Sequence, residues 1–223
     1  MSFKLDTLYL ESLIKTAQTS KLEDPIKKTI QLGLQASCSI YVRSGKKNWS
    51  GSGFHIGNNI IVTAGHVVPQ DQDLTEILIT FDNKNFIPAQ FLTSDPNIDS
   101  GAIRAERIPN NIPELQFANS DGVEVGDIVA VIGSPEGFHD TATVGRVSNI
   151  HQTINDPSMP AWNDIIFVDA DILEGSSGGM VIGTDNLVVG TVMGVTGQHA
   201  DIGVGENSVC PANKIVSMLS KLV

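Results

Sequence analysis

Three residues whose types can cooperate in nucleophilic catalysis lie in segments rich in small residues. Ser177 lies in the glycine-flanked segment 175–179, His66 ends the segment 63–66, and Asp99 lies between them in the sequence. A serine hydroxyl is a weak nucleophile at neutral pH, so it needs an imidazole to accept its proton and a buried carboxylate to orient that imidazole. The three residues therefore predict attack on a carbonyl carbon by Ser177, with His66 as the base and Asp99 as its partner.

The glycines around Ser177 carry a second prediction. Small residues let consecutive backbone amides turn inward, where they can hold the oxyanion of a tetrahedral intermediate. A segment of this kind can therefore provide an oxyanion hole. The competing interpretations are a flexible turn without function, and a domain that keeps the motifs but has no turnover.

Short strands are the elements that would position these residues. After residue 37 the sequence shows two sets of six apolar runs punctuated by turn residues, with a Pro- and Asn-rich break at 108–113 between the sets. The runs are 39–42, 52–56, 60–64, 77–81, 86–92 and 101–104, and then 128–132, 141–150, 165–168, 180–182, 187–195 and 208–210. This pattern predicts an all-β fold of two six-stranded Greek-key barrels with a catalytic cleft between them.

The motifs around the three residues resemble those of the trypsin-like serine protease superfamily, and within it the HtrA/Deg branch. The matching segments are 51–54, 61–68, 95–103, 131–138 and 143–148, together with the segment around Ser177. The resemblance implies a serine endopeptidase that hydrolyses peptide bonds through an acyl-enzyme and needs no cofactor. It also implies that the backbone N–H groups of Gly175 and Ser177 form the oxyanion hole. One departure is that Ser100 and Gly101 follow Asp99, where the family has larger apolar residues, so we expect its carboxylate to be less shielded.

The spacing of apolar residues also suggests a domain organisation. We expect an N-terminal helical extension over 1–36, with two short helices of which the second starts near Asp24, and a trypsin-like protease domain over 37–223. Within that domain we expect barrel 1 at about 37–107, barrel 2 at about 114–210 and a closing helix at 211–223. Members of the HtrA/Deg branch often carry a C-terminal peptide-binding PDZ domain. The chain ends shortly after the closing helix begins, so we expect no PDZ domain.

Substrate specificity is left open by the sequence. Asp171 lies six residues before Ser177, where trypsin-like enzymes that select Lys or Arg place an acidic group. In the HtrA-like register, Ile172, Val192 and Val195 surround a small apolar pocket instead. A third interpretation gives Asp171 no role in substrate binding.

Composition limits the partners and the compartment. The formal net charge of −11 argues against nucleic acid or an anionic membrane, because no basic stripe is available to neutralise phosphates. The histidines outside the motif lack metal-ligand spacing, so we expect no metal site and place these side chains at the surface or in loops.

We see no signal peptide and no membrane span, and therefore expect a cytoplasmic protein. Cys38 and Cys210 are expected to be free, buried thiols, with a single bridge between them as the alternative.

The remaining predictions concern partners and rival functions. We expect a protein or peptide substrate, and N-terminal helices that pack against the body of the chain or, alternatively, form a homo-oligomer contact. A catalytically silent protease-fold module that binds unfolded or peptide segments is the rival to an enzyme, and an esterase is the second.

Overall fold

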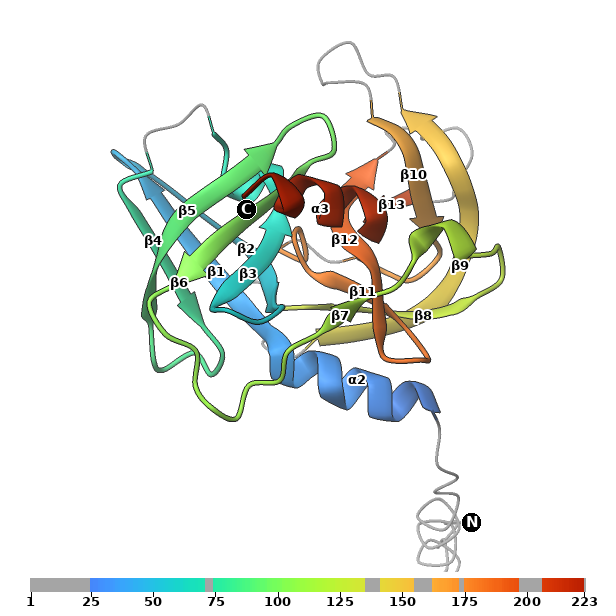
Figure 1. Cartoon of the computed structure of the whole chain (residues 1–223), viewed down its shortest axis with the longest axis horizontal. Helices are drawn as coiled ribbons and strands as arrows, with labels where there is room; N and C mark the ends of the chain where they lie inside the picture. Colours follow the sequence, from blue (N-terminus) through green and yellow to red (C-terminus); the bar gives the residue numbers. More distant parts are fainter. Residues whose placement is uncertain are drawn as a thin grey trace, which may run out of the picture.

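The computed structural model describes residues 25–70, 74–134, 141–154, 162–172, 175–196 and 206–222. Figure 1 shows two β-barrels side by side. Within the described ranges, one α-helix precedes the barrels in the chain and one follows them. The first helix predicted near the N-terminus lies outside the described residues. The second is helix α2 (Pro25–Ala36), which runs directly into the first strand.

Barrel 1 is a closed barrel with the strand order β1-β2-β3-β6-β5-β4. Its strands are β1 (Ser37–Ser44), β2 (Lys47–His55), β3 (Ile60–Ala64), β4 (Glu76–Thr80), β5 (Ile87–Asp95) and β6 (Ser100–Ala105). Alternate side chains such as Ile40, Ile61, Ile79 and Ile103 form its buried core. The pairings of β3 with β6 and of β1 with β4 give the Greek-key order.

Barrel 2 has the strand order β11-β8-β9-β10-β13-β12 and is closed by the pairing of β11 with β12. Its strands are β8 (Ile128–Gly133), β9 (Thr141–Ile154), β10 (Trp162–Val168), β11 (Met180–Gly183), β12 (Leu187–Thr196) and β13 (Glu206–Pro211). A short strand that the sequence did not predict, β7 (Gln116–Phe117), pairs in parallel with β12. The predicted fold of two six-stranded barrels is confirmed.

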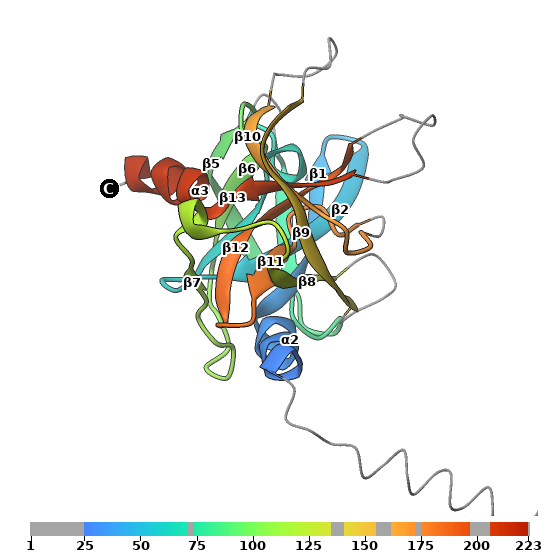
Figure 2. The same ribbon diagram turned by 90° about the vertical axis from the view of Figure 1, so that its right-hand side faces the viewer.

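A hydrophobic cluster joins the two barrels to both helices. It includes Phe54 and Val62 from barrel 1, Ile132 and Met180 from barrel 2, and Ile215 from helix α3 (Ala212–Leu219). Helix α2 packs on β8 and β11, whereas α3 packs on β12 and β13 (Figures 1 and 2). The two barrels therefore share a core, which fixes the strand ends that meet between them.

Candidate active site

His66 lies in the 3-10 turn η1 (Gly65–Val67), which follows directly on β3. Two side chains from other strands hold this turn. The indole Nε1 of Trp49 donates to the carbonyl of Val67 at 2.9 Å, and the hydroxyl of Ser94 donates to the carbonyl of Gly65 at 3.2 Å. The backbone on both sides of His66 is therefore fixed by barrel 1.

Asp99 binds both the ring and the backbone of His66. Its carboxylate oxygens lie 2.9 and 3.1 Å from His66 Nδ1, and Oδ1 also accepts the backbone N–H of His66 at 2.9 Å. An ionised carboxylate can only accept, so Nδ1 carries a proton and Nε2 is left free to act as a base. Asp99 is only 3% exposed. The small residues after Asp99 do not expose its carboxylate, contrary to the expectation that it is less shielded, because Ser100 and Gly101 are themselves buried in β6.

The environment of His66 pulls its pKa in two directions. Burial lowers the pKa of the imidazole, while the hydrogen bond and the negative charge of Asp99 raise it by more. The net result is a His66 pKa above its ordinary value. The side chain is about half exposed, at 52%, so Nε2 has a route to an incoming group.

The loop that carries Ser177 is anchored between the two barrels. The carbonyl of Ser177 accepts from Ser52 N of β2 at 2.8 Å, and the N–H of Gly178 donates to the carbonyl of Val192 of β12 at 2.8 Å. The C=O and the N–H of one trans peptide point in opposite directions. A single peptide group therefore bridges barrel 1 and barrel 2 next to the candidate nucleophile.

Close packing brings this loop to the turn that carries His66. A Cβ at Gly178 would lie 2.2 Å from Thr63 Oγ1 and 2.7 Å from the backbone nitrogen of Ala64. Gly178 also has a φ of +84°, a region that favours glycine. Ser177 thus lies beside the end of β3, from which His66 follows. The described residues form no hydrogen bond between the Ser177 hydroxyl and the His66 ring, and such contacts often tighten only when substrate binds.

The backbone of the same loop fixes the direction of one of the two amides. The carbonyl of Ser176 accepts from Gly179 N at 2.8 Å within the loop, so the N–H of Ser177 on the other side of that peptide points away from it. Gly175 has a φ of +88°, and its carbonyl accepts from the Ser52 hydroxyl at 2.7 Å. The direction of the Gly175 N–H depends on the peptide that joins it to residue 174, which lies outside the described residues.

The four residues assigned to the specificity pocket differ in their surroundings. The side chain of Asp171 is exposed, and its carbonyl accepts from Thr143 Oγ1 at 2.6 Å. Ile172 is half-buried and packs against the valine-rich core of barrel 2, to which the fully buried Val192 belongs. The backbone of Val195 lies in β12, but its side chain is outside the described part of the chain.

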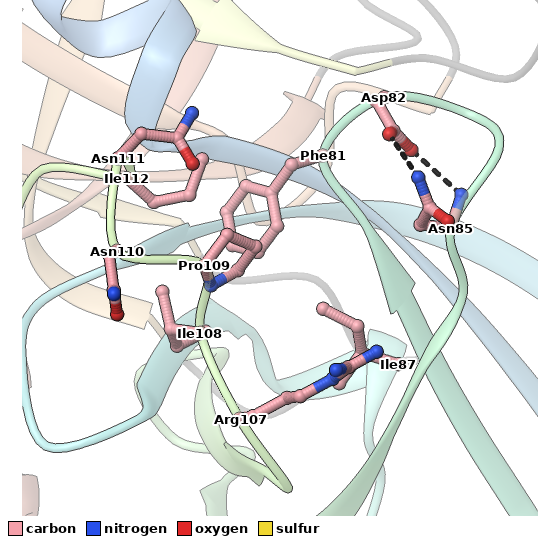
Figure 3. A pocket seen from close by; sticks show the side chains of 10 residues that line it. All are labelled: Phe81, Asp82, Asn85, Ile87, Arg107, Ile108, Pro109, Asn110, Asn111 and Ile112. Atoms are coloured by element: carbon pink, nitrogen blue, oxygen red, sulfur yellow. Dashed lines mark hydrogen bonds between the residues drawn. The ribbon is translucent and has the colours of Figure 1, made fainter.

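Two further features lie away from these residues. A cavity of about 640 Å³ opens between the turn after β4 and the linker between the barrels (Figure 3), and none of its lining residues belongs to the candidate site. His55 is 4% exposed, and its Nδ1 lies 3.1 Å from the carbonyl of Pro113. Its assignment to the surface or a loop is therefore wrong, because it ends β2 and packs under the linker.

Among the described residues, no group of three or more His, Cys, Asp or Glu side chains is placed to hold a metal, and no helix is long and apolar enough to span a bilayer.

Sequence reasoning missed the residues that hold the loops. Ser52 and Trp49 belong to or adjoin the segment that matched the family before His66, but neither had a role, and Ser94 was likewise unassigned. Nothing in the local sequence could have assigned these roles, because each partner lies in a distant segment or is a backbone carbonyl.

The family model of the trypsin-like peptidase domain matches residues 51–190, which include the His66 turn, Asp99 and the Ser177 loop. The chain belongs to the trypsin-like peptidase family. A probable periplasmic serine endoprotease, DegP-like, of Chlamydia pneumoniae is 34% identical over 173 residues, which are 76% of this chain and 34% of that protein. The periplasmic serine endoprotease DegP of Escherichia coli is 28% identical over 164 residues, 73% of this chain and 33% of that protein. The chain thus spans about a third of the length of these curated relatives.

Solved structures share the fold of this trypsin-like peptidase domain. The Rv3671c protease of M. tuberculosis in its active form has a TM-score of 0.74 at 24% identity, over 87% of this chain and 83% of that one. The HtrA-type protease AlgW with a tripeptide has a TM-score of 0.74 at 22% identity, over 88% of this chain and 62% of that one. The predicted recognition of a trypsin-like, HtrA/Deg-like protease domain is confirmed by the family model and the curated relatives, and the solved structures share its fold.

The predicted cytoplasmic location is wrong. The curated relatives are named as periplasmic endoproteases, and this finding overturns it. The prediction was unsound because an export signal is a separate segment that contributes nothing to the folded domain, so the domain sequence carries no information on compartment.

Proposed function

We propose that this chain is a serine endopeptidase that hydrolyses peptide bonds through Ser177, His66 and Asp99. The observation that carries the proposal is the buried carboxylate of Asp99 on His66 Nδ1, beside a loop that presents Ser177 from between two barrels. The names of the relatives support the same chemistry. A binding module has no need of a buried carboxylate on an imidazole nitrogen.

In the proposed mechanism, His66 Nε2 removes the proton from the Ser177 hydroxyl as its oxygen attacks the scissile carbonyl carbon. Asp99 stabilises the imidazolium that forms. The N–H groups of Ser177 and Gly175 hold the oxyanion of the tetrahedral intermediate. His66 then protonates the leaving amine as the peptide bond breaks and the acyl-enzyme forms, and a water activated by the same imidazole hydrolyses that ester.

The direct test is a Ser177→Ala variant together with a fluorophosphonate probe. Removal of the nucleophile in triad enzymes lowers kcat by about 10⁶. We expect the probe to label Ser177 in the folded wild-type chain and not in the variant, which should unfold at the same temperature. A folded wild-type chain that neither reacts with the probe nor cleaves casein would favour the catalytically silent binding module. Reaction with the probe and cleavage of ester substrates without any peptide hydrolysis would favour an esterase.

For specificity, we propose a pocket that accepts small apolar side chains before the scissile bond. The support is that Ile172 packs on the valine-rich core beside the loop, whereas the side chain of Asp171 is exposed. Peptides with Val or Arg at this position would be compared in the wild type and in Asp171→Ala. We expect Val cleavage to dominate and the variant to behave as the wild type. Arg cleavage that disappears in the variant would show a basic pocket instead.

For partners, we propose protein or peptide substrates in the periplasm, as the names of the relatives suggest. Helix α2 packs on β8 and β11 of its own chain, which supports a structural role for this helix. A homo-oligomer contact through the segment before α2 is the alternative, and light scattering on the chain with and without residues 1–24 would detect it.

A further inference from the structure

Ser52 lies in the middle of β2 and makes four hydrogen bonds although it has no exposed surface. Its hydroxyl donates to the carbonyl of Gly175 at 2.7 Å and accepts from Ser134 N at 2.9 Å. Its backbone N–H donates to the carbonyl of Ser177 at 2.8 Å, and its own carbonyl accepts from Thr63 Oγ1 at 2.7 Å. One buried residue of barrel 1 thus binds two carbonyls of the loop 175–179, here called the nucleophile loop, and the backbone amide of Ser134 just after β8.

These bonds act on the groups that the proposed mechanism needs. A hydroxyl has one proton to donate, and Ser52 gives it to the carbonyl of Gly175. That bond fixes the peptide plane on the carboxyl side of Gly175, so its own N–H can reorient only by rotation about the two backbone torsions of Gly175, whose φ is +88°. The bond to the Ser177 carbonyl fixes a second plane two residues further along. Both candidate oxyanion donors therefore belong to residues that Ser52 anchors.

On this basis we propose, resting on the proposed protease function, that Ser52 is a positioning residue that holds the nucleophile loop in its oxyanion-binding conformation. The surroundings of the Ser52 hydroxyl are closely packed, because a Cβ added at Gly133 would lie 3.0 Å from Ser52 Oγ and 3.3 Å from Ser176 Cα. Loss of one hydroxyl leaves too small a space for a water molecule. Without the hydroxyl, the Gly175 carbonyl and the buried Ser134 N–H must find other partners, and the loop must shift.

Ser39 supplies a matched control. It is a buried serine on the neighbouring strand β1, 2% exposed, and its hydroxyl donates to the carbonyl of Ser134 at 3.2 Å. It therefore contacts Ser134, the residue after β8, as Ser52 does, but within the described part of the chain its side chain forms no hydrogen bond to the nucleophile loop. Ser39→Ala removes a buried hydroxyl of equal size from the same barrel wall, so it reports the general cost of such a change.

The experiment compares Ser52→Ala with Ser39→Ala on one peptide substrate. Loss of an oxyanion donor lowers kcat by about 10² to 10³, so we expect Ser52→Ala to lower kcat by about 10²-fold with KM changed less than about threefold. Affinity for a peptide boronate, whose tetrahedral adduct fills the oxyanion hole, should fall in parallel, while affinity for the matching product peptide should not. Ser39→Ala should leave all three quantities near those of the wild type.

Equal kcat values in the two variants, or a change in KM alone, would overturn the proposal. If Ser52→Ala does not fold, Ser52→Cys is measured in its place, because its weaker donor and longer bonds to sulfur also displace the Gly175 carbonyl. Agreement of its kcat with that of Ser39→Ala within threefold would have the same meaning. A wild-type chain that fails to react with the fluorophosphonate probe would instead refute the protease function, so the two failures are distinct.

Discussion

Replacing Asp99 with Asn tests the proposed chemistry most directly. Asn has nearly the same shape and tolerates the left-handed backbone at this position, where φ is +46°, so the fold should survive. Its amide can still accept the backbone N–H of His66 through oxygen, which turns the NH₂ group toward Nδ1. Nδ1 must then accept, the ring proton moves to Nε2, and the unprotonated nitrogen that would act as the base is lost. In the Ser-His-Asp template this change costs about 10⁴ in kcat, equivalent to about 5.5 kcal/mol of transition-state stabilisation.

The same substitution has a second consequence that does not depend on the size of the rate. In the wild type the pKa of His66 is raised, so activity should increase with pH through a midpoint above about 6.5, the ordinary value. In Asp99→Asn both raising causes are gone and burial remains, so the midpoint of the residual activity should move to lower pH. The measurement is kcat and KM on one fluorogenic peptide from pH 5 to 9, with thermal unfolding as the control for folding. A kcat within tenfold of the wild type and an unmoved midpoint would refute the assignment of Asp99.

Two further predictions concern the packing. Gly178→Ala places a Cβ against barrel 1 at a φ of +84° and should destabilise the fold by about 3 kcal/mol or more, which lowers Tm by about 6–12 °C. The control is Gly122→Ala, where a Cβ meets nothing within 4 Å, and its free energy of unfolding should stay within about 0.5 kcal/mol of the wild type. Similar Tm values for the two variants would contradict this account. Cys38 and Cys210 are free and buried, and burial raises the pKa of both thiols, so a disulfide reagent should detect no thiol in the native chain and two after unfolding; rapid reaction in the native state would show that one of these sites opens.

Much of the fold was predictable because its signals are local. Each apolar run between turn residues encodes one strand, and all twelve predicted runs are strands in the structure. Strand β7 escaped prediction because two residues carry no periodicity. The division into an N-terminal extension and a protease domain remains a prediction.

The candidate site was predictable in its residue types but not in its supports. Serine, histidine and aspartate in small-residue segments are unusual enough to be found in sequence. The burial of Asp99 was misjudged because Ser100 and Gly101 are small, whereas in the fold they lie inside a closed barrel. His55 was misplaced because a polar residue at a strand end gives no local sign of the linker that covers it.

By itself, then, the sequence determined which segments are strands, which residues can do chemistry, and that the segment around Ser177 is built of small residues. The tertiary structure alone decided that the carboxylate of Asp99 is buried, that Ser177 is presented from between two barrels, and that Ser52 binds a loop more than a hundred residues away. The physical reason is that strand formation depends on neighbours along the chain. Burial and hydrogen-bond partners depend on which distant strands close each barrel, and no local pattern records that choice.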